Sequence, residues 1–208
     1  MIWWKGFVNK FLIRLFDIFF SLSGLILLSP VFLVTGIIIS IDSHGKVFFT
    51  QIRVGKNNID FKLYKFRTMY SNSGRNQKIT IGSRDPRITR AGYYIRKYKL
   101  DELPQLFNVL QGVMSLVGPR PELRHYTELY SLAHQMIVLS VKPGITDFAS
   151  IEYSKENELL SAVADPENYY INVLIPAKAR LNLIFIENPT LINYLHIIFR
   201  TISKLFVR

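Results

Sequence analysis

The chain has 208 residues, of which 49% are hydrophobic and 20% charged. It can therefore bury one sizeable core, or the core of a small domain together with a membrane element, and this composition excludes disordered, collagen-like and coiled-coil chains. The 26 Lys and Arg against 15 Asp and Glu give a net charge of +11, which favours an anionic partner such as nucleic acid, an acidic membrane surface or a phosphorylated substrate. The absence of cysteine excludes a disulfide framework, a thiol nucleophile and Cys-ligated zinc.

The positive charge is concentrated in the middle of the chain. Residues 42–100 carry 14 basic and 3 acidic side chains, whereas residues 101–208 carry 9 and 11. This distribution is compatible with a nucleic-acid-binding protein, whose base-stacking residues would be Tyr64, Phe66, Tyr93 and Tyr94. It is equally compatible with a pocket for a diphosphate, the remaining cations facing anionic lipid. The net charge alone does not choose between these two.

An uncharged apolar segment runs from Ile18 to Ile41, 24 residues in all. As a straight helix it would measure roughly 36 Å, which is enough to cross a bilayer. Its length and the absence of a small-x-small cleavage site argue against a signal peptide. Ser29-Pro30 lies in the middle, where Pro30 removes a backbone donor and clashes with the carbonyl of Ile26. The sequence therefore predicts a helix that is broken at Ser29-Pro30.

Basic residues flank this segment at both ends: Lys5, Lys10 and Arg14 before it, and Lys46, Arg53 and Lys56 after it. The positive-inside bias then places both ends on the cytoplasmic side. Residues 1–41 are therefore predicted to form a re-entrant membrane helix that enters and returns. A kinked helix that crosses the bilayer remains the alternative, because proline is tolerated in spanning helices.

A β-hairpin is predicted next, with strands over residues 47–54 and 61–69 around the turn 55–58. Alternation puts Gln51 and Arg53 on one face of the first strand, and Lys65 and Arg67 on one face of the second. If the two faces coincide, three cations and an amide converge in a way that suits a phosphate. A solvated hairpin face is the alternative.

The remaining pattern is helical, so the fold class is helix-rich α+β, with residues 42–190 as one domain on the cytoplasmic face. The predicted elements are a loop over 70–90, helices over 93–99, 103–111 and 122–140, a turn at 142–144, and a solvated helix and loop over 152–167. Residues 191–208 form an apolar helix with a basic stripe: His196, Arg200, Lys204 and Arg208. Such a stripe favours an amphipathic helix at the membrane interface. Packing on the core is the alternative.

Asp101-Glu102 is the strongest chemical signal in the sequence. Adjacent carboxylates at a helix start can simply cap it. Here, however, they follow three basic residues, Arg96, Lys97 and Lys99, and precede Arg120, which stands between two prolines. These cations are expected to keep both carboxylates ionised. An ionised Asp can attack phosphorus, and a neighbouring Glu can hold Mg²⁺.

Five motifs together resemble one family. They are Thr50-Gln51-Ile52-Arg53-Val54-Gly55, Tyr64-Lys65-Phe66-Arg67-Thr68-Met69, Leu100-Asp101-Glu102-Leu103-Pro104-Gln105-Leu106-Phe107-Asn108-Val109-Leu110, Gly118-Pro119-Arg120-Pro121 and Lys142-Pro143-Gly144-Ile145-Thr146. In this order and spacing they resemble the bacterial sugar transferases, the monotopic phosphoglycosyl transferases. The resemblance runs from about Phe16 to at least Thr146 and is specific only as a combination.

The resemblance implies transfer of a sugar-1-phosphate from a UDP-sugar to polyprenyl (undecaprenyl) phosphate, with release of UMP, at the cytoplasmic face of the bacterial inner membrane. It implies that Asp101 is the nucleophile and Glu102 the Mg²⁺ ligand. It further implies phosphate binding by Lys65, Arg96 and Arg120, in a pocket shaped by Gln51, Arg53 and Arg67. The partners it implies are the UDP-sugar, the lipid phosphate and membrane lipids, with no nucleic acid; a homo-oligomer stays open.

The sequence departs from the family pattern after Thr146, where Asp147-Phe148-Ala149-Ser150 replaces the common Gly-Trp-Ala-Gln and an acidic stretch follows as far as Pro166. The resemblance therefore implies no sugar or nucleotide contacts from that region. Asp147 could contact a sugar or a base, but stabilising a turn is the favoured role. Two other classes remain as alternatives, a membrane-tethered nucleic-acid binder and a non-catalytic lipid-binding scaffold. Neither accounts for Asp101-Glu102 as well as the enzyme does.

Overall fold

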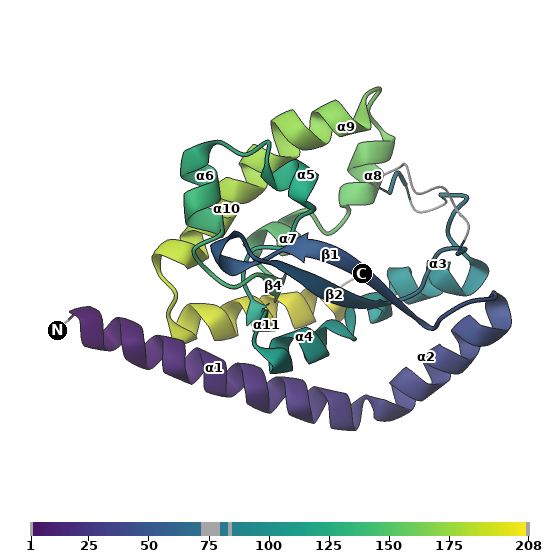
Figure 1. The fold of residues 1–208 in the computed structure, drawn as a ribbon, viewed down its shortest axis with the longest axis horizontal. Helices are drawn as coiled ribbons and strands as arrows, with labels where there is room; N and C mark the ends of the chain where they lie inside the picture. The colour runs from purple at the N-terminus through teal and green to yellow at the C-terminus, as the bar shows by residue number, and fades with distance from the viewer. Residues whose placement is uncertain (1, 72–79, 83–84, 207–208) are drawn as a thin grey trace.

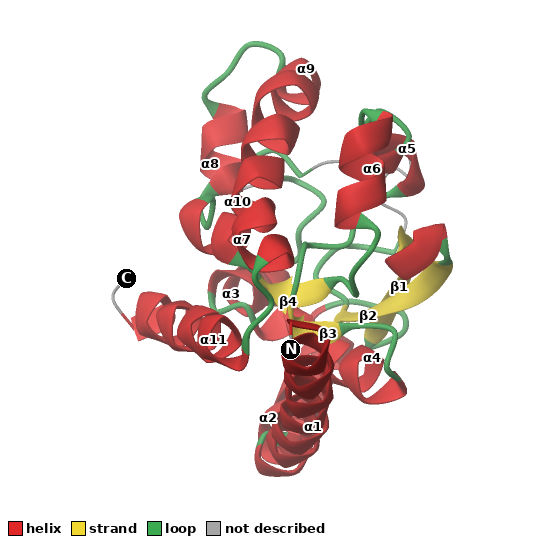
Figure 2. Ribbon diagram, turned by 90° about the vertical axis from the view of Figure 1, so that its left-hand side faces the viewer, coloured by secondary structure: helices red, strands yellow, loops and turns green. Residues whose placement is uncertain are grey.

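Helices dominate the computed structural model (Figure 1), and the strands form two small sheets (Figure 2). The structure describes residues 2–71, 80–82 and 85–206. The helices are α1 (Ile2–Leu27), α2 (Ser29–Asp42), α3 (Arg90–Lys97), α4 (Gln105–Gln111), α5 (Arg124–Thr127), α6 (Leu132–Val138), α7 (Phe148–Glu152), α8 (Glu156–Ser161), α9 (Pro166–Tyr169), α10 (Ile175–Glu187) and α11 (Leu191–Phe206). The strands are β1 (Phe48–Val54), β2 (Asp60–Phe66), β3 (Ser115–Val117) and β4 (Gly144–Thr146). The 3₁₀ turns are η1 (Lys56–Asn58) and η2 (Leu100–Glu102), and η3 (Tyr170–Leu174) is a π-helix. The predicted helix-rich α+β class is confirmed.

Helices α1 and α2 form a bent pair along the base of the molecule (Figure 1). They meet at an angle of 59° across Leu28. Pro30 lies in the first turn of α2 and has no N–H to donate. The hydroxyl of Ser29 donates to the carbonyl of Ile26 at 2.8 Å, so the break leaves this carbonyl with a partner. The predicted break at Ser29-Pro30 is confirmed.

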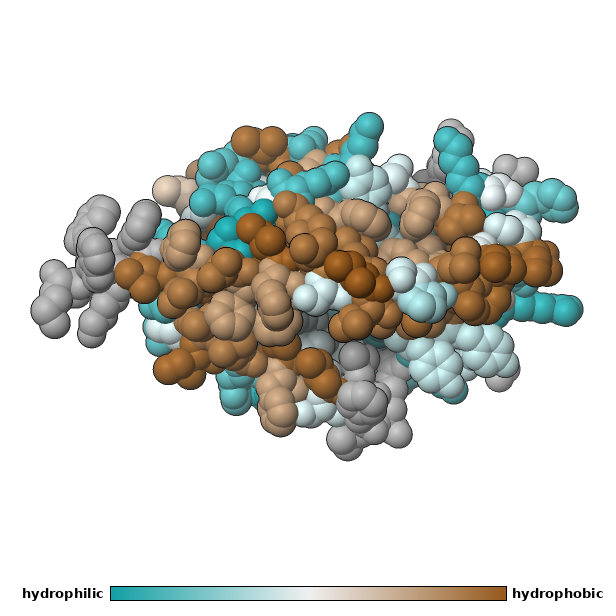
Figure 3. Space-filling view, turned by 90° about the horizontal axis from the view of Figure 1, so that it is seen from below, coloured by the Kyte–Doolittle hydropathy of each residue, from teal (hydrophilic) through white to brown (hydrophobic). Residues whose placement is uncertain are grey.

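The outer surface of this pair is strongly apolar (Figure 3). Its most exposed side chains include Phe11, Phe19, Ile26, Leu27, Leu33 and Ile41. No single helix in the described part of the chain is long and apolar enough to span a bilayer, whereas Val8–Leu27 and Ser29–Asp42 meet both criteria when taken together. An exposed apolar band of this kind is suited to lipid or to a protein partner. The re-entrant course through a membrane stays a prediction.

Two polar side chains of α1 join this helix to the rest of the molecule. Arg14 donates to the carbonyls of Val109 and Leu110, at 2.6 and 2.9 Å, and so caps the C-terminal end of α4. One turn further on, Asp17 accepts a hydrogen bond from the backbone N–H of Leu116 in β3 at 2.8 Å. Arg14, which the sequence suggested only as a flanking cation, therefore also fixes α1 against α4.

Strands β1 and β2 pair antiparallel, as predicted. The register sets Lys65 opposite Phe49 and Arg53 opposite Phe61, and opposite residues share a face. Gln51, Arg53 and Lys65 therefore do lie on one face. The second strand ends at Phe66, three residues before the predicted end at Met69, because its partner strand begins at Phe48, which lies opposite Phe66. Met69 instead forms an isolated antiparallel bridge with Ile88.

The short parallel sheet positions the Gly118–Pro121 segment. Gly118 donates to the carbonyl of Thr146, and Gly144 donates to the carbonyl of Pro119, at 3.0 and 2.9 Å. The two glycines pass so closely that a Cβ on Gly144 would lie 2.1 Å from the nitrogen of Gly118. Any larger residue must push the two segments apart. The Gly-Pro-Arg-Pro and Lys-Pro-Gly motifs are thus two sides of one contact.

We expect Gly144→Ala to destabilise the protein by about 3 kcal/mol or more, because the backbone of Gly118 cannot move away without breaking the β3–β4 pairing. Thermal unfolding in detergent measures this. Gly36→Ala is the matched control, since its Cβ would meet its nearest atom at 3.5 Å, an ordinary contact. Equal melting temperatures for the two variants would contradict the close-contact explanation.

The predicted helix over 122–140 is wrong, because the structure has two short helices, α5 and α6, in its place. Glu122 is drawn away from a helical course when its carbonyl accepts the N–H of Val54 at 3.0 Å. The side chain of Ser131 then accepts the N–H of His134 and starts α6. The C-terminal helix α11 is confirmed. Of its predicted basic stripe, Arg208 lies outside the described residues.

Candidate active site

A large cavity of about 870 Å³ lies between the β1–β2 hairpin, η2, the Gly118–Glu122 segment and helices α7, α8 and α10. This volume is within the usual range for small-molecule and cofactor sites. The residues predicted for the site and found in the cavity wall are Gln51, Arg53, Lys65, Arg67, Arg96, Asp101, Glu102 and Arg120. The structure therefore gathers into one cavity residues that are up to 69 positions apart in the sequence.

Asp101 and Glu102 lie in η2, the single 3₁₀ turn between α3 and α4. Lys99, at a φ of 57°, adopts the left-handed conformation and turns the chain out of α3 into η2. Only 9% of Asp101 is exposed, and its Oδ1 has no hydrogen-bond partner within the described part of the chain. A buried polar atom without a partner is rare and points to a group that arrives with a ligand.

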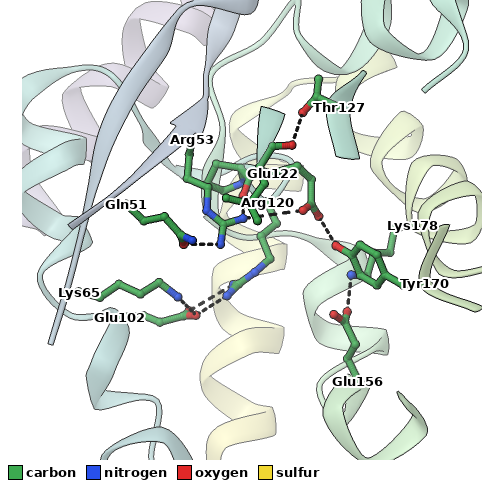
Figure 4. A network of polar contacts seen from close by, with 12 residues as sticks. Gln51, Arg53, Lys65, Glu102, Arg120, Glu122, Thr127, Glu156, Tyr170 and Lys178 are labelled. Carbon is green, nitrogen blue, oxygen red and sulfur yellow. Dashed lines mark hydrogen bonds and ion pairs between the residues drawn. The ribbon is translucent and has the colours of Figure 1, made fainter. Parts of the chain in front are cut away.

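Glu102 is held by two cations (Figure 4). Its carboxylate accepts from Nη2 of Arg120 at 2.6 Å and from Nζ of Lys65 at 3.4 Å. Burial by itself raises the pKa of Glu102, but the charges of Arg120 and Lys65 outweigh burial and hold this pKa well below its usual value. In return, Glu102 raises the pKa of Arg120. Glu102 is therefore firmly ionised.

The pKa of Asp101 moves in the opposite direction. Burial raises it, and the neighbouring charge of Glu102 raises it further, whereas Lys65 and Arg96 lower it. The net result is a pKa above the usual value for aspartate. The sequence led us to expect the same effect of the cations on both carboxylates. The structure shows that the cations offset burial at Glu102 but not at Asp101.

The cations around the dyad are themselves poorly solvated. Burial lowers the pKa of Lys65, with Glu102 acting against this, and burial likewise lowers the pKa of Arg96 despite the charge of Asp101. An incoming anion would favour the charged forms of both side chains. The cavity is therefore suited to a ligand that brings negative charge, such as a diphosphate.

Arg53 connects the hairpin to the loop that carries Arg120. It donates to Oε1 of Gln51 at 2.8 Å and to the carbonyl of Pro121 at 3.1 Å, and it lies 3.8 Å from the carboxylate of Glu122. Glu122 also accepts from the hydroxyl of Tyr170 at 2.7 Å. Arg53, supported by Gln51, thus holds the Pro-Arg-Pro segment in place at the wall of the cavity.

The guanidinium of Arg67 contacts the end of α2 rather than Glu102, contrary to the prediction that Arg67 shares a phosphate-binding face with Lys65. Its guanidinium donates to the carbonyls of Ile39, Ser43 and His44, at 3.3 and 2.7 Å for the first two. These carbonyls end α2, so Arg67 caps that helix while its side chain forms part of the cavity wall. The physical reason is that the carbonyls of Ser43 and His44, just beyond the last residue of α2, lie together with that of Ile39 within reach of one planar guanidinium.

Asn108 lies within the motif from Leu100 to Leu110, and the sequence predicted no separate role for it. It is 0% exposed. Its Oδ1 accepts from the N–H of Tyr64 at 3.0 Å, and its Nδ2 donates to the carbonyl of Lys62 at 2.7 Å. The side chain thereby fastens β2, which carries Lys65, to α4, which follows the dyad. A polar residue at a position facing the core was the one available signal.

We expect Asn108→Ala to cost about 2–4 kcal/mol of stability, because it leaves two backbone groups of β2 buried without partners. Chemical or thermal unfolding measures the loss. Asn172→Ala serves as the control, since Asn172 is exposed on η3 and its loss should change stability by less than about 0.5 kcal/mol. Similar effects in both variants would show that Asn108 is not a structural clamp.

Asp147 has the turn-stabilising role that the sequence favoured. It precedes α7 and its carboxylate accepts from the N–H of Ser150 and from the N–H of Arg120 at 3.2 Å. It therefore caps a helix and restrains Arg120 at once. The nucleic-acid alternative is weakened at Phe66, which is only 2% exposed and packs with Ile39 and Ile95, so its ring cannot stack on a base.

The donor set fits Mg²⁺ only in combination with a substrate. In the described residues, no three His, Asp or Glu side chains converge on one point. Mg²⁺, however, is commonly bound by one or two carboxylates with substrate phosphates and water completing the shell. Glu102 and the unpartnered oxygen of Asp101 provide such a partial set.

Comparison with known proteins identifies a family of sugar transferases. The family model described as bacterial sugar transferase matches residues 8–208. A UDP-N-acetylgalactosamine-undecaprenyl-phosphate N-acetylgalactosaminephosphotransferase of Aeromonas hydrophila is 39% identical over 168 residues, covering 79% of this chain and 40% of that protein. A UDP-glucose:undecaprenyl-phosphate glucose-1-phosphate transferase of Klebsiella pneumoniae is 36% identical over 203 residues, covering 96% and 41%. The exopolysaccharide production protein PSS of Rhizobium leguminosarum bv. phaseoli is 38% identical over 210 residues, covering 94% and 95%.

The chain thus spans about 40% of the length of the first two relatives and 95% of the third. The match of the family model reaches from within α1 to the end of the chain. It therefore includes the bend between α1 and α2, the cations Lys65, Arg96 and Arg120, and the turn with Asp101 and Glu102. On this match, the chain belongs to the bacterial sugar transferase family.

Proposed function

We propose that the protein transfers a sugar-1-phosphate from a UDP-sugar to a polyprenyl phosphate through a covalent intermediate on Asp101. The observation that carries this proposal is the buried carboxylate oxygen of Asp101, which has no partner among the described residues and lies in a cavity that also holds Lys65, Arg96 and Arg120. A carboxylate beside three cations, of which Lys65 and Arg96 are largely desolvated, is suited to attack a bound diphosphate. Two relatives named above act, by their names, on undecaprenyl phosphate, one with UDP-N-acetylgalactosamine and one with UDP-glucose.

The first step forms a bond between a carboxylate oxygen of Asp101 and the phosphorus that bears the sugar. The bond from this phosphorus to the UMP oxygen breaks, and UMP leaves with the electron pair. Lys65, Arg96 and Arg120 bind the phosphate oxygens and stabilise the charge that develops on them. Glu102 would hold Mg²⁺ together with the diphosphate of the bound donor. When the ion is bound, its positive charge favours the departure of UMP.

The second step restores the enzyme. An oxygen of the lipid phosphate attacks the same phosphorus, the bond to Asp101 breaks, and the carboxylate is regenerated. The attack must come from the side opposite Asp101, which is the side that UMP has vacated. A polyprenyl phosphate presents its phosphate at the headgroup level of a membrane, so the cavity must lie close to that plane.

We place the apolar band of α1 and α2 in the cytoplasmic leaflet of the inner membrane as a re-entrant element, and α11 at its interface. Support for α11 comes from its exposed apolar residues Ile192, Phe199 and Ile202, beside the exposed cations Arg200 and Lys204. Cations next to an apolar face are typical of an interfacial helix. This arrangement keeps both ends of the bent pair on one side and the cavity beside the headgroups.

The direct test is release of UMP from a panel of UDP-sugars with undecaprenyl phosphate, with and without Mg²⁺. The proposed function predicts UMP release that needs Mg²⁺ and a UDP-sugar. A nucleic-acid-binding protein or a lipid-binding scaffold would release none. Absence of UMP with every donor of the panel would overturn the proposal.

Glu102→Gln is expected to lower kcat/KM for UMP release by about 100-fold or more and to raise the Mg²⁺ concentration needed for half-maximal rate. The amide removes the charge that pairs with Arg120 and Lys65 and binds the metal more weakly. A Mg²⁺ titration of both proteins measures the change. Glu158→Gln is the control, because Glu158 is exposed and pairs only with Lys155 at 4.0 Å among the contacts described. Wild-type activity at the same Mg²⁺ requirement would contradict a metal role for Glu102.

A further inference from the structure

A second polar cluster lies in the same cavity, across from Glu102 and Lys65 in Figure 4. We name it the distal cluster and define it by Glu156, Lys178 and Asn182. The Nζ of Lys178 forms an ion pair with the carboxylate of Glu156 and lies 4.8 Å from the ring centroid of Tyr170. The side chains of Lys178 and Glu156 are only 12% and 27% exposed. The distal cluster thus offers one cation, one anion and one amide on the cavity wall.

The geometry of α10 brings part of this cluster to the cavity. Ile175, Lys178, Ala179 and Asn182 follow the spacing of one helix face and all line the cavity. Asn182 is only 9% exposed, and its Oδ1 has no hydrogen-bond partner in the described part of the chain. Since buried polar atoms are nearly always paired, this amide is expected to gain its partner from a ligand.

Packing alone does not require these groups. Apolar residues of similar volume commonly replace a largely buried ion pair without loss of stability. The nearby pair of Lys155 and Glu158 differs in this respect, because its side chains are 71% and 62% exposed and interact mainly with solvent. The charges of Glu156 and Lys178 are therefore better explained by a polar ligand in the cavity than by folding.

The order of the two displacements indicates which part of the donor lies here. UMP must leave from the side opposite Asp101, and the lipid phosphate must enter by the same side. The sugar, in contrast, stays bound through both steps. Helices α8 and α10 lie on the opposite side of the molecule from α1 and α2, the helices proposed to meet the membrane (Figure 1). The end of the cavity beside α8 and α10 is therefore free for the group that does not leave.

The chemistry of the distal cluster matches a sugar ring. Each ring hydroxyl both donates and accepts hydrogen bonds, so a carboxylate, an ammonium and an amide side by side can contact neighbouring hydroxyls with opposite roles. We propose that Glu156, Lys178 and Asn182 bind the sugar of the UDP-sugar and determine which sugar is accepted. This inference rests on the proposed transfer reaction and extends it to the choice of donor.

The test compares kcat/KM for UMP release with UDP-glucose, UDP-galactose, UDP-N-acetylglucosamine and UDP-N-acetylgalactosamine. The variants are Glu156→Gln, Lys178→Met and Asn182→Ala, with Glu158→Gln as the matched control. We expect the ratio between the best donor and its C4 epimer to fall about tenfold or more in at least Glu156→Gln and Lys178→Met, because a site built for a hydroxyl loses its discrimination when its charged partner is removed. The Kd of UMP, measured by calorimetry, should change less than about twofold.

Three results would overturn the inference. Equal losses with all four donors would show that the cluster only supports the fold, and a weaker Kd for UMP in step with the loss would show that it binds the nucleotide. Unchanged ratios would show that it does not contact the donor. Glu156→Asp, which keeps the charge, covers the case in which Glu156→Gln fails to fold, and its expected result is a shifted ratio with unchanged UMP affinity. If the wild-type protein releases no UMP from any donor, the proposed function itself fails, which is distinguishable from a failure confined to the variants.

Discussion

Asp101→Asn is expected to lower the rate of sugar-phosphate transfer by about four orders of magnitude or more. The amide has nearly the shape of the carboxylate but cannot form the bond to phosphorus, and loss of a nucleophile is among the largest effects of a single substitution in enzymes. Release of UMP under single-turnover conditions measures the chemical step directly. The variant should still bind UMP, since Lys65, Arg96 and Arg120 are unchanged.

The same substitution should leave stability equal or increase it. Burial and the charge of Glu102 raise the pKa of Asp101, which means that the folded protein disfavours the ionised form relative to a solvated aspartate. A neutral side chain removes this unfavourable contribution, as is common when a catalytic group is replaced. Asp165→Asn, at the exposed cap of α9, is the control for activity. A variant at position 101 that keeps substantial activity would remove Asp101 from the mechanism.

The course of the bent helix pair leads to the second large effect. Lys10→Cys and Lys46→Cys should both react with an impermeant maleimide from the cytoplasmic side, because a re-entrant pair returns both ends to that side. The chain contains no cysteine that would confuse the reading. Replacing Ser29 and Pro30 by Ala and Leu restores a backbone donor and helix propensity across the break, and the 24 uncharged residues are then long enough to span.

We expect the straightened protein to lose at least about 90% of its activity, whether position 10 moves across the membrane or the protein inserts poorly. Arg14 and Asp17 attach α1 to α4 and β3, so a change in the course of α1 must either break these hydrogen bonds or shift η2, which precedes α4, from its place. Labelling of positions 10 and 46 from opposite sides in the otherwise unmodified chain would contradict the re-entrant course.

The elements that could be predicted from sequence depend on local chemistry. A proline inside a helix removes a backbone donor and kinks or breaks the helix, as Pro30 does here. The hairpin of β1 and β2 follows from the alternation of residues around a turn. The predicted end of a helix at residue 111 is of the same kind, because Gly112, which follows it, adopts a φ of 82° that other residues rarely accept. The identity of a few neighbouring residues was sufficient to predict each of these elements.

The features that could not be predicted depend on distant partners. Arg14 contacts Val109, which is 95 residues away, and Arg67 contacts Ser43, which is 24 residues away. A guanidinium binds a phosphate or a helix end equally well, so the residue type does not reveal the choice. The single helix expected over 122–140 failed for a similar reason, since the hydrogen bond from Val54 to Glu122 exists only in the folded chain.

The candidate site also has features that could be predicted from the sequence and features that could not. The gathering of Lys65, Arg96, Asp101, Glu102 and Arg120 was implied by the family resemblance. The difference between the two carboxylates was not, because it depends on which of them the cations reach. Arg120 contacts Glu102 at 2.6 Å, while Asp101 keeps one oxygen unpaired among the described residues. Only the folded geometry separates the ion-paired Glu102 from Asp101, whose Oδ1 lacks a partner in the part of the chain that the structure describes.

The most direct test of the central claim is to incubate the protein with a UDP-sugar and Mg²⁺ in the absence of polyprenyl phosphate, stop the reaction rapidly, and measure both UMP and the mass of each peptide. The two-displacement account predicts a burst of UMP no larger than the amount of enzyme, and a phospho-sugar adduct on the peptide at Asp101. Release of UMP only after the lipid phosphate is added, or an adduct that maps to another residue, would contradict it.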